Sequence, residues 1–179
     1  IEKYKVEDGL IDNNIKGLFI DEKNNLWIGT PIGLTVLNIE TNEITDFTSR
    51  LIKAGIKEPY VRTVYEDKDE DGVYWIGGYI SEGLIKFDIN KDTIEMYSKY
   101  EEKGKQVIVN TIRTIVEDEE NNLWIGTNSG LLKFNKIDKK FKSYTEKDGL
   151  ANNIVYQILK DDDKNIWMST NNGISKFDI

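Results

Sequence analysis

One tryptophan-centred segment occurs four times in this sequence and limits the folds that the chain can adopt. Residues 121–127 (NNLWIGT) share their pattern with residues 24–30 (NNLWIGT), 72–78 (GVYWIGG) and 163–170 (DKNIWMST). All four tryptophans of the chain lie at this position: Trp27, Trp75, Trp124 and Trp167. They are separated by 43 to 49 residues, and a period of about 40–50 residues is typical of propellers and solenoids.

Each repeat predicts four short strands. In the last repeat we expect an outer strand at 141–145, an alternating strand at 154–160, the tryptophan strand at 166–170 and a third strand at 174–177. Turns rich in Gly, Asn and Asp separate them, as in consecutive hairpins. No segment keeps a helical period over three turns. The sequence therefore predicts an all-β fold, a β-propeller of four four-stranded antiparallel blades, with residues 1–179 as one domain or a fragment of one.

The sequence leaves two arrangements of these blades open. Residues 1–5 are similar to the outer strand at 141–145, so they would complete the last blade and close a four-blade ring. Alternatively, the four blades form an open arc of a larger propeller, or pair with a second copy as a homodimer. An open arc would expose packing faces that require a partner. We favour closure.

Charge and composition exclude several classes of function. The net charge is −8, from 24 Lys and Arg against 32 Asp and Glu, which argues against nucleic acids and anionic membrane surfaces as partners. The chain has no Cys and no His, so thiolate nucleophiles, Cys-based zinc sites and histidine general bases are excluded. We expect no cofactor. The chain starts at Ile1 without a signal peptide, so we also expect it to be part of a longer product.

The pattern in residues 110–134 closely resembles the two-component regulator propeller repeat. The Asp-Gly-Leu triplets at 8–10 and 148–150 belong to the same pattern, whereas the second repeat departs from it, with Gly78 in place of Thr and Val73-Tyr74 before the tryptophan. This resemblance implies the extracytoplasmic sensor segment of a bacterial signalling protein, anchored to the membrane through a segment outside this chain. It also implies recognition of oligosaccharides, as in the hybrid two-component systems of gut bacteria.

Unequal loops suggest where a ligand would bind. Residues 47–61 and 97–112, between an outer strand and the next inner strand, are longer than their counterparts, as is the turn at 78–83. We expect all three on one face, around the second and third blades. Because structural repeats need equal loops, unequal loops are the better functional candidates.

A row of cations lies at the entrance to the inner strands. Counting back five residues from Asp21, Asp67, Asp118 and Asp161 gives one equivalent position, occupied by Lys16, Arg62, Arg113 and Tyr156. We expect a funnel for a hydroxyl-rich or anionic ligand, with the two arginines as bidentate donors. Other expected ligand-binding residues are Tyr60 or Tyr79, as an aromatic platform, and Asn110. Alternatively, each cation simply pairs with Glu66, Glu117 or a carboxylate of a neighbouring blade.

Residues 67–72 (DKDEDG) match the start of an EF-hand calcium loop. The twelfth position is Gly78 rather than Glu, and strands rather than helices are expected on both sides. A solvated turn is therefore the preferred interpretation, and no metal site is predicted.

These observations favour a non-catalytic, ligand-sensing propeller. A scaffold that binds another protein or a second copy is the main alternative. A propeller glycosidase or lyase is less favoured, because glycoside hydrolysis needs two carboxylates across a sugar site and the inner-strand entrances offer Lys, Arg, Arg and Tyr.

Overall fold

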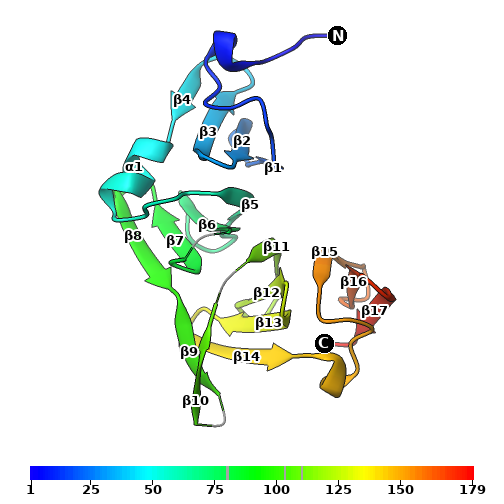
Figure 1. Cartoon of the computed structure of the whole chain (residues 1–179). Coiled ribbons are helices and arrows are strands. Elements are labelled where there is room, and N and C mark those ends of the chain that lie inside the picture. Colours follow the sequence, from blue (N-terminus) through cyan, green and yellow to red (C-terminus); the bar gives the residue numbers. More distant parts are fainter. Residues whose placement is uncertain (80, 103, 110) are drawn as a thin grey trace.

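The computed structural model describes residues 1–79, 81–102, 104–109 and 111–179. These residues form four antiparallel sheets of three or four strands that follow one another along an arc (Figure 1), and one separate two-stranded sheet. Within each sheet the strands are ordered as they occur in the chain. The predicted all-β fold is confirmed, and each of the four sheets along the arc is one blade of a β-propeller.

Three of the blades have four strands. Blade 1 contains β1 (Gly17–Ile20), β2 (Asn25–Thr30), β3 (Gly33–Asn38) and β4 (Ile44–Asp46). Blade 2 contains β5 (Val61–Glu66), β6 (Val73–Gly78), β7 (Leu84–Asp88) and β8 (Thr93–Tyr97). Blade 3 contains β11 (Ile112–Glu117), β12 (Asn122–Thr127), β13 (Gly130–Asn135) and β14 (Lys140–Tyr144). Blade 4 contains three strands within the described residues: β15 (Val155–Lys160), β16 (Ile166–Thr170) and β17 (Gly173–Phe177).

The long loops contain structure of their own. The loop between blades 1 and 2 holds helix α1 (Thr48–Lys53), and the loop between blades 2 and 3 holds a hairpin of β9 (Lys99–Glu102) and β10 (Lys105–Ile108). Single 3₁₀ turns lie at Val6–Asp8 and Glu146–Asp148. Helix α1 was not predicted, because six residues are too few to show a helical period. In the described part of the chain, no helix is long and apolar enough to cross a lipid bilayer.

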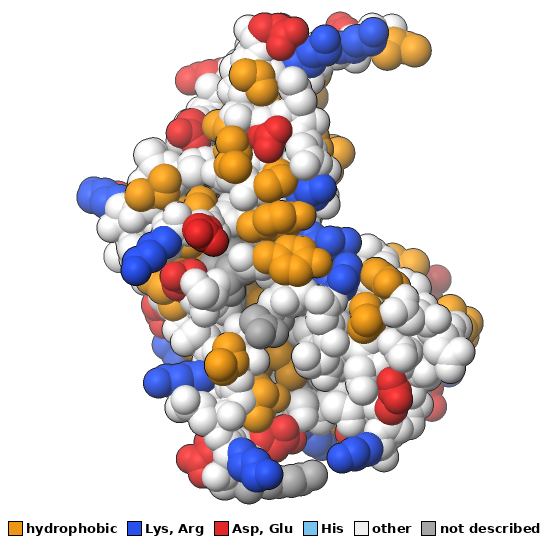
Figure 2. All heavy atoms as spheres, viewed as in Figure 1, with side chains coloured by type: hydrophobic (Ala, Val, Ile, Leu, Met, Phe, Trp, Pro, Cys, Tyr) orange, Lys and Arg blue, Asp and Glu red, His pale blue; other side chains and the backbone are white. Residues whose placement is uncertain are grey.

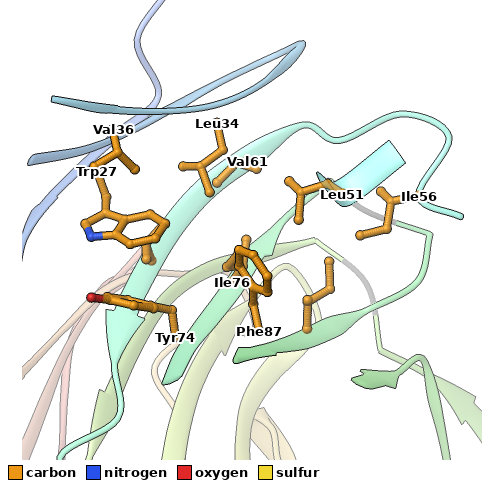
Figure 3. Close-up of a cluster of buried hydrophobic side chains, with 11 residues drawn as sticks. Trp27, Leu34, Val36, Leu51, Ile56, Val61, Tyr74, Ile76 and Phe87 are labelled. Atoms are coloured by element: carbon orange, nitrogen blue, oxygen red, sulfur yellow. The ribbon is translucent and has the colours of Figure 1, made fainter. Parts of the chain in front are cut away.

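The tryptophans fill the junctions between blades. Trp27, Trp75 and Trp124 are each 1% exposed. The Trp27 ring lies 4.1 Å from the ring of Tyr74 in the next blade, and α1 adds Leu51 to the same cluster (Figure 3). The blades approach so closely that a Cβ on Gly29 would lie 2.7 Å from the carbonyl oxygen of Val61. The structure thus confirms a packing role for these three tryptophans.

The arc is open, which corrects the expected closure of the ring. Blade 1 and blade 4 lie at opposite ends of the arc, and the N-terminal residues lie beside blade 1 (Figure 1). Residues 1–5 form no strand, and the Tyr4 hydroxyl donates a hydrogen bond to Asn42 Oδ1 of blade 1 over 3.0 Å. Held in this way, the segment does not reach β17, and no fourth strand completes blade 4 among the described residues.

Candidate functional site

A shift in strand register marks the start of three inner strands. In each of β5, β11 and β15, pairing with the next strand skips one residue, and the skipped residues are Arg62, Arg113 and Tyr156. Lys16 directly precedes β1, and its backbone N–H donates to the Gly29 carbonyl. Bulges of this kind redirect side chains and are common beside functional sites. The structure therefore places all four predicted residues at equivalent positions at one end of the blades.

Arg113 and Tyr156 contact each other across the junction of blades 3 and 4. The guanidinium carbon lies 4.7 Å from the centre of the tyrosine ring, a cation–π distance. Arg113 Nε donates to Asn128 Oδ1, and the Tyr156 hydroxyl donates to Asn171 Oδ1. Sequence reasoning missed both amides. Their shared position, directly after the threonine that ends β12 or β16, is a signal that could have identified them.

Tyr60 and Tyr79 form a second pair at the same end of the blades. Their ring centres are 4.8 Å apart at an interplanar angle of 71°, and the Tyr79 N–H donates to the Tyr60 carbonyl over 3.2 Å. The loop before β5 thus meets the turn after β6, so these two enlarged segments share one face, as predicted. Figure 2 shows hydrophobic and basic side chains next to each other where the arc is hollowed. The predicted residue Asn110 lies outside the described residues.

The predicted cations are not neutralised by the acids that the alternative interpretation named. Glu66 accepts a hydrogen bond from the Glu22 backbone N–H over 2.9 Å, and Glu117 pairs with Lys136. Both acids end their inner strands, opposite the bulges. Among the described residues, no carboxylate forms a salt bridge with Lys16, Arg62 or Arg113.

At the opposite end of the blades, an aspartate in each turn accepts a hydrogen bond from the tryptophan of the same blade. The indole N–H groups of Trp27, Trp75, Trp124 and Trp167 donate to Asp21, Asp67, Asp118 and Asp161 over 2.7–2.8 Å. Burial opposes ionisation of Asp21, Asp67 and Asp118, but the hydrogen bonds outweigh it and hold their pKa values below the ordinary value. This recurring contact stabilises each turn.

The ammonium group of Lys136 lies among the carboxylates of the turn that matches an EF-hand start. Asp67, Asp69 and Glu117 have carboxylate oxygens within 4.8 Å of one another, and the Lys136 ammonium pairs with all three. Burial raises the pKa of Glu117, whereas burial of Lys136 is outweighed by these partners, which raise the lysine pKa. A calcium ion would have to displace this ammonium. The geometry therefore fits an ion network between blades 2 and 3.

Two cavities lie at opposite ends of the blades. One of about 490 Å³ is lined by Phe19, Tyr65 and several carboxylates of the aspartate end. The other, of about 190 Å³, lies between hairpin β9–β10 and blade 3, at the end that carries the bulges.

Comparison with known proteins identifies the repeats. The family model described as "two component regulator propeller" matches residues 9–31, 106–129 and 149–172. A protein named Histidine kinase P4, from Formosa agariphila, is 34% identical over a 154-residue alignment, with coverage of 80% of this chain and 10% of that protein.

Two solved structures from B. thetaiotaomicron are similar over almost the whole chain. Both are extracellular domains assigned to hybrid two-component systems. One is 26% identical, with a TM-score of 0.74 over 100% of this chain and 23% of its own. The other is 22% identical, with a TM-score of 0.74 over 97% of this chain and 22% of its own, and supports the fold alone.

The chain thus spans about a tenth of the curated relative and less than a quarter of each solved domain. The family match falls on the first, third and fourth repeats, and the second repeat is the one whose sequence departs from the pattern. The chain therefore carries two-component regulator propeller repeats in its first, third and fourth blades.

Proposed function

We propose that this chain is a non-catalytic, ligand-sensing part of a bacterial two-component signalling protein and lies outside the cytoplasm. Its ligand is hydroxyl-rich or anionic, with an oligosaccharide as the leading class, and it binds at the bulged ends of the inner strands. The similar extracellular domains of hybrid two-component systems support the location and the signalling role. The whole protein would be anchored to the membrane through a segment outside these residues.

The observation that carries this proposal is the way in which Arg113 is held. Asn128 accepts its Nε–H and the ring of Tyr156 supports one face of the guanidinium, while no described residue accepts a hydrogen bond from its two terminal nitrogens. A guanidinium fixed in this way loses little conformational entropy when it binds a carboxylate or vicinal hydroxyls. Arg62, at the equivalent bulge, would supply a second donor.

The test is calorimetric titration of the chain with neutral and acidic oligosaccharides, preceded by a thermal-shift screen. A ligand at 100 times its Kd adds about 2.7 kcal/mol to the free energy of unfolding, which is readily visible as a higher Tm. We expect the double variant Arg62→Ala/Arg113→Ala to weaken binding by at least about tenfold. Recovery of the ligand intact after long incubation separates sensing from hydrolysis.

A charge-matched control is available. The double variant Lys91→Ala/Lys140→Ala removes two exposed cations from the aspartate end of blades 2 and 3, and we expect it to bind like the parent chain. Unchanged affinity in the arginine variant would refute the proposed funnel.

A protein-interaction role is the second candidate, because the outer face of blade 4 is apolar and exposed. Leu159, Trp167 and Ile174 are 64%, 38% and 68% exposed. Their counterparts in blade 1 are Phe19, Trp27 and Leu34, and the latter two are 1% and 0% exposed beneath blade 2. Another propeller blade, or a second copy of the chain, would cover this face. Sedimentation velocity tests self-association: the scaffold role predicts oligomers that Trp167→Lys dissociates, and a monomer at every concentration argues against a second copy.

A further inference from the structure

The cavity beside hairpin β9–β10 has walls of two kinds. Tyr100, Val107 and Ile108 of the hairpin form an apolar wall. Glu102, Ser129 and Ser143 contribute a carboxylate and two hydroxyls. The cavity lies at the same end of the blades as the bulged inner strands, but outside the row of cations.

Contacts with blade 3 hold the hairpin in place. The ring of Tyr100 lies 5.2 Å from the ring of Phe141 in β14, and both oxygens of Glu102 accept from Ser143 Oγ, over 2.9 and 2.7 Å. A two-stranded hairpin is marginal by itself, so these contacts keep the wall ordered. Side chains alternate along β9: Tyr100 and Glu102 are partly buried, whereas Glu101 between them is exposed.

The lining selects a neutral, hydroxyl-rich ring. No lysine or arginine lines the cavity among the described residues, and Glu102 would repel an anion. A carboxylate can accept hydrogen bonds from two neighbouring hydroxyls, while an apolar wall packs against the C–H face of a sugar ring. The volume of about 190 Å³ is below the ~300–1,000 Å³ of sites for drug-sized ligands, so the cavity suits a single ring.

The turn between β12 and β13 joins this cavity to the row of cations. Asn128 holds Arg113 on one side of the turn, and Ser129, the next residue, lines the cavity on the other side. We infer that the cavity between hairpin β9–β10 and blade 3 binds one neutral sugar ring, with Glu102 as hydrogen-bond acceptor. The assignment of that ring to the end of a longer oligosaccharide, whose next units cross the turn to Arg113, rests on the proposed function.

The experiment is saturation-transfer NMR of the 179-residue chain with the methyl glycosides of glucose, galactose, mannose and arabinose, followed by titration of each binder. We expect transfer to at least one glycoside, and Glu102→Ala to weaken its binding by at least about tenfold. Glu101→Ala removes the same charge from the exposed side of the hairpin and should bind normally. Ile108→Trp, which enlarges an exposed residue of the cavity lining without removing a hydrogen-bonding group, should also abolish binding.

The outcomes separate this inference from the proposed function. No transfer to any of the four glycosides, or transfer that neither Glu102→Ala nor Ile108→Trp reduces, overturns the inference. If Arg62→Ala/Arg113→Ala lowers oligosaccharide affinity while Glu102→Ala and Ile108→Trp leave glycoside binding unchanged, the proposed ligand site at the cations is supported. The sugar site in the cavity is then refuted. If Glu102→Ala weakens glycoside binding but Arg62→Ala/Arg113→Ala leaves oligosaccharide affinity unchanged, the sugar site in the cavity is supported. The proposed ligand site at the cations is then refuted.

Discussion

The ammonium nitrogen of Lys136 lies 3.0 Å from each carboxylate oxygen of Asp67, across the junction between blades 3 and 2. The lysine side chain is 8% exposed and the aspartate side chain is fully buried. At the junction of blades 1 and 2 the equivalent aspartate, Asp21, instead accepts a hydrogen bond from the Tyr74 hydroxyl over 2.8 Å. At these two junctions the aspartate thus accepts a hydrogen bond from the following blade, from a lysine ammonium in one case and a tyrosine hydroxyl in the other.

Replacing Lys136 should strongly lower the free energy of unfolding. Lys136→Met leaves Asp67 and Glu117 buried without their cation, which typically costs about 3–5 kcal/mol of unfolding free energy. Lys139→Met is the matched control, because Lys139 is exposed and pairs only with exposed Glu95 among the described carboxylates; it should cost less than about 1 kcal/mol. Urea unfolding measures both, and equal losses would show that the buried network does not stabilise the junction.

The tryptophan-bound aspartates should make stability fall in acid. The pKa of Asp118 is lowered in the folded chain because hydrogen bonds from Trp124 and Asn122 outweigh its burial. Its contribution is therefore complete above the unfolded pKa of about 3.9 and is lost as pH falls through the folded pKa. The difference in unfolding free energy between the parent chain and Asp118→Asn should shrink as pH falls from about 5 to about 2.5. A difference that is independent of pH would contradict this linkage.

The tryptophans should differ in their contribution to stability, although they share one sequence position. Trp124→Ala opens a cavity at a closed junction and should cost about 3–5 kcal/mol. Trp167→Ala should cost clearly less, because that ring is already 38% exposed. Urea unfolding of the two variants at low protein concentration is the measurement. Equal losses would mean that Trp167 is covered in solution.

Helix α1 should act as part of the core. Leu51 is 0% exposed and belongs to the cluster at the junction of blades 1 and 2, whereas its neighbour Ile52 is 55% exposed. Leu51→Ala should destabilise by about 2–5 kcal/mol, and Ile52→Ala by no more than about 0.5 kcal/mol. If thermal and urea unfolding show equal losses for Leu51→Ala and Ile52→Ala, then α1 does not pack as described. Its loop would then again be a candidate ligand contact.

Much of the architecture could be read from the chain alone. The spacing of the tryptophans predicted the blades, and the strand predicted at 166–170 has the bounds of β16. Counting back from the aspartates identified Arg62, Arg113 and Tyr156, and all three lie at equivalent bulges. These features depend on pairing between neighbouring strands, which alternation and turn residues specify within one repeat.

Other features were decided only by the tertiary structure. The sequence could not show that α1 enters the core, that the hairpin packs on blade 3, or that Lys136 reaches Asp67, 69 residues away. Nor could it decide between a closed ring and an open arc, and closure was the wrong preference. All of these depend on how far each blade is rotated and stacked against the next. That geometry results from side-chain packing between repeats, whereas the sequence pattern specifies only the hydrogen-bonded partners within each one.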